Sequence, residues 1–165
     1  MAFSMERVLA LWRVGLLSEG EVIDWADRRI LAVEPPSDAL VELSLHGPQK
    51  YLNLPAADFP RLESLSFEEE FSLRASALDL ASNPEGQSFV RWLAGACMGR
   101  DLAEPEVALG YRVDHLWNDC DDMPAAIAFL RENLPALLPQ CRARSAPFWA
   151  AFDPGSTPDE DRRVH

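Results

Sequence analysis

The spacing of apolar residues restricts the fold of this chain more than any other feature of its sequence. Along most of the chain these residues recur at steps of three or four, which places them on one face of an α-helix. In the first such segment they are Met5, Val8, Leu9, Trp12 and Leu16. No alternating pattern of the kind found in half-buried strands continues for more than a few residues. The sequence therefore predicts an all-α protein.

Residues that start and stop helices divide the chain into about seven short helices with proline-rich connections. Ser18–Glu21 and Ser66–Glu69 are capping boxes, in which both side chains can pair with free backbone amides at a helix N-terminus. Pro35 ends the second helix, and Gly47 and Pro48 are expected to end the third. The predicted helices cover about 4–16, 18–34, 37–45, 66–78, 87–99, 105–120 and 122–134. Residues 46–65 are expected to form a loop with at most one helical turn.

Length and composition fit one folded domain. The chain has 165 residues, of which 48% are hydrophobic and 25% charged, and a chain of this size buries roughly 70% of the surface that it exposes when unfolded. We expect residues 1–152 to form a single helical domain. The remainder, 153–165, is polar, contains proline and has no periodicity, which predicts a disordered acidic tail.

The charge of the chain restricts its partners. With 27 acidic and 15 basic residues, its formal net charge of -12 repels nucleic acids and anionic membranes and attracts basic protein surfaces. No apolar run approaches the roughly 20 residues that a membrane-spanning helix needs. Cys97, Cys120 and Cys141 are an odd number at wide spacings, and no secretory signal accompanies them. We therefore expect a cytoplasmic protein with a basic protein partner and no cofactor.

The strongest candidate for chemistry is a cluster around His115. His115 and Asp119 are four residues apart and share a helix face, and Asp114, Asp121 and Asp122 lie close in sequence. A divalent cation would need further ligands, so we favour a helix surface pair without metal and keep a metal-dependent hydrolase as the alternative.

Cysteine chemistry is not expected from the sequence. Cys97 and Cys120 fall on predicted apolar helix faces, and no recognisable motif pairs either of them with a histidine or a basic residue. Phosphate-binding loops, nucleophile elbows and zinc-protease motifs are also absent from the sequence. The sequence therefore favours a protein that is not an enzyme.

Two acidic regions are candidates for binding a partner. Asp24 and Asp27 are expected to project from their helix on the side away from Val22 and Ile23. Trp25 is expected beside that buried stripe, at the edge of the acidic face, where a tryptophan can anchor an interface. The complete set of predicted partner-binding residues is Asp24, Trp25, Asp27, Asp114, Asp119 and Asp121.

One segment carries a resemblance to known proteins. The residues that carry the resemblance are Gly15–Asp27, Pro35, Pro36 and the helix that ends with Leu43–Leu45. Through them the N-terminal third of the chain resembles the opening of small helical bacterial proteins of unknown function, some of which are similar to immunity proteins encoded beside secreted toxins. The resemblance implies a cytoplasmic inhibitor that covers the active site of a cognate toxin, and many such toxins are basic nucleases. An adaptor or chaperone that keeps its partner soluble is a further alternative, which a large exposed apolar patch would favour.

Overall fold

The computed structural model of the chain describes residues 2–153, with side chains from Ser4 onward, and that part is helical without a strand. The predicted all-α class is therefore confirmed, with eight α-helices in the described part where about seven were predicted. The described chain divides into two compact units, residues up to 64 together with 146 onward, and residues 65–145. The predicted disordered tail lies, apart from Asp153, outside the described residues.

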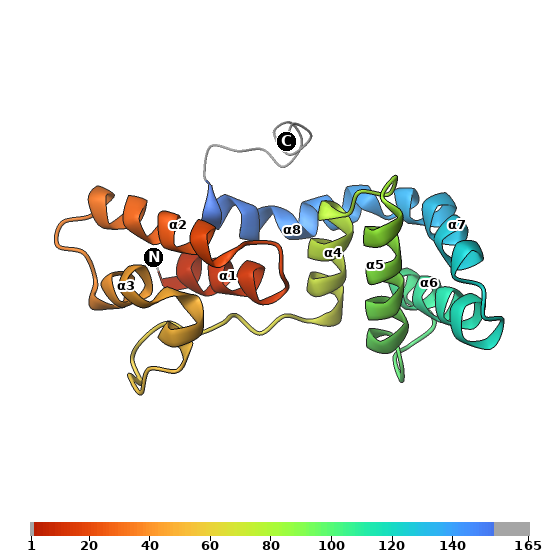
Figure 1. Cartoon of the computed structure of the whole chain (residues 1–165), viewed down its shortest axis with the longest axis horizontal. Helices are drawn as coiled ribbons and strands as arrows, with labels where there is room; N and C mark the ends of the chain where they lie inside the picture. Colours follow the sequence, from red (N-terminus) through yellow and green to blue (C-terminus); the bar gives the residue numbers. More distant parts are fainter. Residues whose placement is uncertain (1, 154–165) are drawn as a thin grey trace. The chain divides into compact units, whose positions relative to one another are not determined.

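The first unit contains α1 (Ala2–Arg13), α2 (Glu19–Ala32), α3 (Asp38–Leu52) and the part of α8 (Leu138–Phe152) that begins at residue 146 (Figure 1). The capping box at Ser18 is confirmed, because the Ser18 hydroxyl accepts from the Glu21 amide and the Glu21 carboxylate accepts from the Ser18 amide. Helices α2 and α3 pack closely against each other, and the unit has a buried apolar core. Its buried side chains include Val8, Leu9, Leu11, Val22, Leu43 and Tyr51.

Helix α3 continues beyond the predicted stop. Gly47 has φ 71° and ψ 168°, so the backbone breaks there, as expected. Pro48 then becomes the first residue of a further helical stretch that ends at Leu52, because proline is tolerated in the first turn of a helix. The predicted loop over 46–65 is therefore wrong for its first residues, and the irregular segment begins at Asn53.

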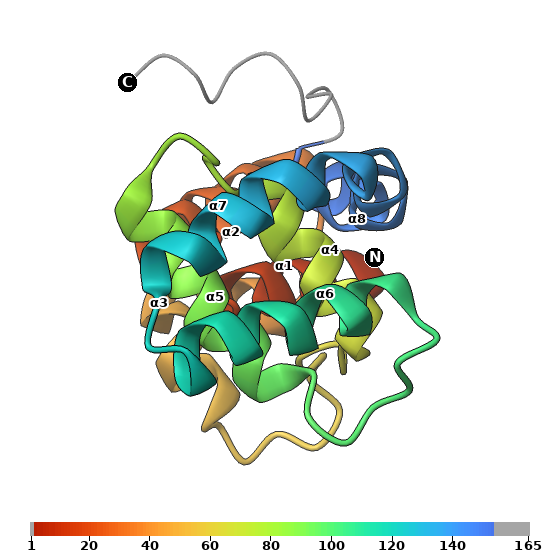
Figure 2. The ribbon, with the colours of Figure 1, turned by 90° about the vertical axis from the view of Figure 1, so that its right-hand side faces the viewer.

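The second unit contains α4 (Phe67–Ala77), α5 (Asn83–Ala96), α6 (Pro105–Asp114), α7 (Met123–Asn133) and the first part of α8. Between α6 and α7 runs a π-helical turn, η1 (His115–Asp119), and a short 3₁₀ turn, η2 (Leu134–Ala136), follows α7. Helices α5, α6 and α7 pack against one another (Figure 2). Aromatic contacts fill the core, and the ring centroids of Phe71 and Phe89 lie 5.7 Å apart.

Two predictions on helix bounds in this unit are corrected. The helix predicted to begin at residue 87 begins at Asn83, because the turn-forming residues 83–86 make the first turn of α5, which Ser82 caps and in which Pro84 is tolerated. Helix α8 was not predicted, because Pro135 and Pro139 break the apolar pattern after residue 134. Pro139 lies in the first turn of α8, where a missing amide hydrogen costs nothing, and Cys141 is fully buried behind it. No helix of the described residues combines the length and apolar character needed to cross a membrane.

Candidate functional site

The outer side of α2 carries exposed carboxylates. Asp24 and Asp27 are both exposed, and Asp27 accepts a hydrogen bond from the Ser44 hydroxyl of α3. Neither forms an ion pair with another described residue, since the neighbouring arginines turn elsewhere. Arg28 lies over the ring of Phe152 and Arg29 lies over the ring of Trp25, at 5.9 and 5.7 Å from the centroids. Neither carboxylate is therefore balanced by a basic side chain among the described residues.

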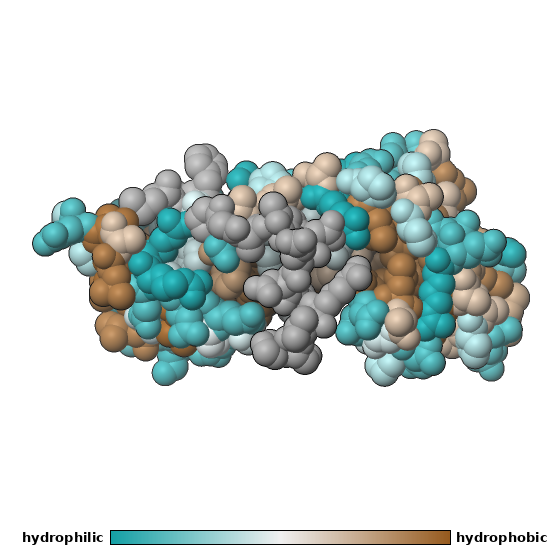
Figure 3. Space-filling view, turned by 90° about the horizontal axis from the view of Figure 1, so that it is seen from above, coloured by the Kyte–Doolittle hydropathy of each residue, from teal (hydrophilic) through white to brown (hydrophobic). Residues whose placement is uncertain are grey.

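Large apolar side chains are exposed beside these carboxylates. Leu31 of α2 is 88% exposed, and it follows Asp24 and Asp27 at helical spacing, so the three share one side of α2. Leu45, 70% exposed, directly follows Ser44 on α3. Figure 3 shows hydrophobic surface at the end of this unit where α2 leads into α3. We call the surface formed by Asp24, Asp27, Leu31 and Leu45 the α2–α3 face.

Trp25 does not belong to this face. It is 3% exposed, and its indole Nε1 donates to the carbonyl oxygen of Ala151 at 3.1 Å. The expectation of an interface anchor at the edge of the acidic face is therefore wrong. Trp25 follows Val22 by three residues and precedes Ala26 directly, and these three are the buried residues of α2.

A pocket of about 420 Å³ opens in the first unit and is lined in part by Trp25. Its walls include Met5, Leu40, Phe59 and Pro60. The exposed carboxylates of Asp38 and Asp58 and the partly buried Arg29 also border it. Apolar walls with a few charged groups suit a small amphipathic molecule or a single inserted side chain.

In the second unit the structure brings His115, Asp119 and Cys120 together. His115 Nδ1 lies 2.8 Å from Asp119 Oδ2, as the predicted surface pair requires. His115 Nε2 lies 3.7 Å from the Sγ of Cys120. The predicted position of Cys120 on an apolar face is wrong, because the residue is exposed, whereas Cys97 is fully buried as expected.

The other predicted acidic residues of this region have separate roles. Asp114 is partly buried, and its Oδ1 accepts from Asn118 Nδ2 at 2.6 Å. Asp121 is exposed and has φ 52°, while Asp122 caps α7 by accepting from the amide of Ala125, as predicted. Among residues 4–153, no group of three or more His, Cys, Asp or Glu side chains is arranged to hold a metal ion.

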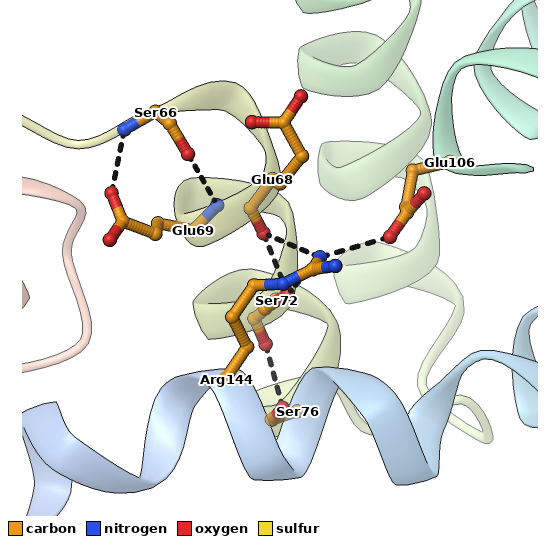
Figure 4. Close-up of polar contacts among 7 residues, drawn as sticks. All are labelled: Ser66, Glu68, Glu69, Ser72, Ser76, Glu106 and Arg144. Carbon is orange, nitrogen blue, oxygen red and sulfur yellow. Dashed lines mark hydrogen bonds and ion pairs between the residues drawn. The ribbon is translucent and has the colours of Figure 1, made fainter. Parts of the chain in front are cut away.

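A buried polar cluster that the sequence did not indicate joins α4, α6 and α8 of the second unit (Figure 4). Arg144 donates to Glu106 Oε1 at 3.0 Å and to the Ser72 hydroxyl at 3.3 Å, and the Glu106 side chain is only 3% exposed. Hydrogen bonds from its own amide and from Ser66 lower the pKa of the neighbouring Glu68. Burial raises the pKa of the Cys141 thiol. Because every buried side-chain polar atom of the described residues has a partner, we interpret the cluster as structural.

Comparison with known proteins adds no relative. No protein-family model, no curated protein and no solved structure matches the chain.

Proposed function

We propose that this chain is a non-enzymatic binding protein that neutralises a basic bacterial toxin, and that its α2–α3 face meets the partner. One observation carries the proposal: Asp24 and Asp27 are exposed without an ionic partner among the described residues, beside the exposed Leu31 and Leu45. Had the two carboxylates been buried or paired within the described chain, they would have been explained by the fold alone.

Charge and apolar surface contribute different parts of such binding. Exposed carboxylates speed the encounter with a basic surface and penalise acidic competitors, but they add little affinity while they remain hydrated. Full burial of an exposed leucine contributes about 1.5 to 3 kcal/mol. Leu31 and Leu45 are therefore the proposed source of affinity, and Asp24 and Asp27 the proposed source of rate and specificity.

The resemblance to immunity proteins supports the same surface. The residues that carry it, Gly15–Asp27 and Leu43–Leu45, form the cap and first part of α2 and the middle of α3. The net charge of -12 suits a basic partner such as a nuclease toxin. The alternative of a metal-dependent hydrolase gains no support, because the described residues assemble no metal ligands around His115.

The test uses the protein encoded beside this chain, purified and titrated against the full chain at low and at high salt. Reversing both charges with Asp24→Lys and Asp27→Lys should weaken binding at least about tenfold at low salt and much less at high salt. The matched control is Glu104→Lys with Glu132→Lys, which changes the net charge equally on exposed residues of the second unit.

Leu31→Ser provides an independent arm, because it removes apolar contact and leaves the charge of the face unchanged. It should weaken binding at both salt concentrations. Equal effects of the two charge-reversal pairs would show that only net charge matters and would overturn the assignment of the α2–α3 face. Failure of the wild-type chain to bind the neighbouring protein at low salt would overturn the proposed function.

A further inference from the structure

The His115 side chain is oriented for proton transfer to or from Cys120. A carboxylate can only accept hydrogen bonds, so Asp119 Oδ2, at 2.8 Å, holds the ring hydrogen on Nδ1 of the neutral imidazole. The lone pair of Nε2 is then free, and this atom lies 3.7 Å from the Cys120 Sγ. Cys120, His115 and Asp119 can thus act as a nucleophile, a base and a group that orients the base.

The π-helical turn η1 makes this arrangement possible. In a regular α-helix, residues five apart point about 140° away from each other. Here the Cys120 amide donates to the carbonyl oxygen of His115 at 3.1 Å, a bond between residues five apart, and the wider turn brings the two side chains to the same side. Helices α6 and α7 pack against η1 and hold it in place.

Cys120 is also the accessible thiol of the described chain. Cys97 and Cys141 are both fully buried, and burial raises the pKa of each thiol, because the charged thiolate loses its hydration. Cys120 is exposed, and so are His115 and Asp119, with side-chain exposures of 49% and 68%. A dissolved reagent can therefore reach the sulfur directly.

We propose that Cys120 is a site of thiol–disulfide exchange with low-molecular-weight disulfides, in which His115 takes up and returns the proton and Asp119 positions the imidazole. The Cys120 proton passes to His115 Nε2, and the thiolate attacks one sulfur of the disulfide. The S–S bond of the reagent breaks, and its departing thiolate takes the proton back from the imidazolium. The products are a mixed disulfide at Cys120, whose sulfur is oxidised, and one free thiol, which is the reduced half of the reagent.

The surrounding charge selects the disulfide. Four aspartates lie within six residues of the thiol along the chain, at η1 and its flanks: Asp114, Asp119, Asp121 and Asp122. The arginine or lysine nearest to Cys120 in sequence is Arg112, whose guanidinium lies over the ring of Phe129. A field of this sign concentrates cations and repels anions. The site is therefore built for a disulfide with amino groups rather than one with a net negative charge.

The experiment measures mixed-disulfide formation on the reduced full chain at neutral pH by intact mass, with peptide mapping of the modified cysteine. The reagents are cystamine, which is cationic, and glutathione disulfide, which is anionic. We expect one adduct, at Cys120, formed at least about tenfold faster with cystamine. His115→Gln should slow the cystamine reaction about tenfold or more, and Asp119→Asn should slow it less, because the imidazole remains but loses its orientation.

The matched control is His46→Gln. His46 also pairs with a carboxylate four residues away, since its Nε2 lies 3.1 Å from Glu42, but the pair belongs to the first unit and has no thiol beside it. This variant should react as the wild type does, and Cys120→Ser should form no adduct. Equal rates with both disulfides, an unchanged rate in His115→Gln, or modification of Cys97 in place of Cys120 would each overturn the proposal. None of these outcomes bears on the α2–α3 face, which belongs to the other unit.

Discussion

Removing the guanidinium of Arg144 should destabilise the second unit strongly, because it leaves Glu106 without its cation. The Glu106 side chain is 3% exposed, and its Oε1 accepts from Arg144 at 3.0 Å. Loss of one partner of a buried ion pair costs about 3 to 5 kcal/mol. Arg144 is itself 31% exposed, so water can partly replace it, and we place the cost of Arg144→Met at about 2 to 3 kcal/mol.

The assay is urea unfolding of the full chain at neutral pH, followed by circular dichroism and tryptophan fluorescence. Arg91→Met is the matched control, since Arg91 is an exposed residue of α5 in the same unit, and its loss should change the free energy of unfolding by less than about 0.5 kcal/mol. Methionine retains much of the aliphatic stem of arginine, so lost packing contributes little to either value.

A second variant separates the charge from the contact. Adding Glu106→Gln to Arg144→Met removes the uncompensated charge, so the double variant should be more stable than Arg144→Met alone by at least about 1 kcal/mol. The reasoning fails if Arg144→Met behaves like Arg91→Met, or if the double variant is no more stable than the single one. Either result would mean that the Glu106 carboxylate does not depend on Arg144.

Three further predictions concern the first unit. Burial raises the pKa of Tyr51 to about 12 against the opposing effect of Arg61, so between pH 10 and 12 the folded phenol keeps its proton while the unfolded one loses it. The free energy of unfolding should therefore fall by about 2 to 3 kcal/mol over this range, and thermal melting at several pH values should show a smaller loss for Tyr51→Phe. Gly47→Ala should lower the free energy of unfolding in urea by about 1 to 2 kcal/mol, because φ is 71° at this residue and an added Cβ would meet the Glu19 carboxylate. An unchanged urea midpoint of unfolding would contradict this argument. The pocket should bind anilinonaphthalene sulfonate with a rise in fluorescence. Ser4→Phe, which occupies part of the pocket, should reduce that rise, and equal fluorescence in both proteins would place the dye elsewhere.

Three helix starts were predicted correctly because their chemistry is local. The boxes at Ser18 and Ser66 and the cap at Asp122 each need side chains and amides within three residues, and all three are present in the structure. The projection of Asp24 and Asp27 to solvent is equally local, since it follows from the periodicity of α2. Features that depend on a few consecutive residues can be derived from a single sequence.

Features that depend on distant residues could not be predicted in this way. Glu106 lies in the first turn of α6, where the helix dipole alone favours a carboxylate, so nothing in the sequence indicated its bond to Arg144, 38 residues away. Helix α8 was missed for a related reason. Its prolines argue against a helix locally, while the burial of Cys141, Ser145 and Phe148 along it comes from packing that only the folded chain shows.

The His115–Cys120 contact was not predicted because a regular α-helical period was assumed for residues 105–120. With 3.6 residues per turn, Cys120 belongs to the apolar side of a helix that also holds Leu109, Val113 and Leu116. The π-helical turn changes the register after Asp114, which moves Cys120 to the exposed side and places it beside His115. Turns of this kind are uncommon and often accompany functional sites, since a regular helix is the more stable alternative. The change of register is therefore itself an argument that this position has a role beyond the packing of the second unit.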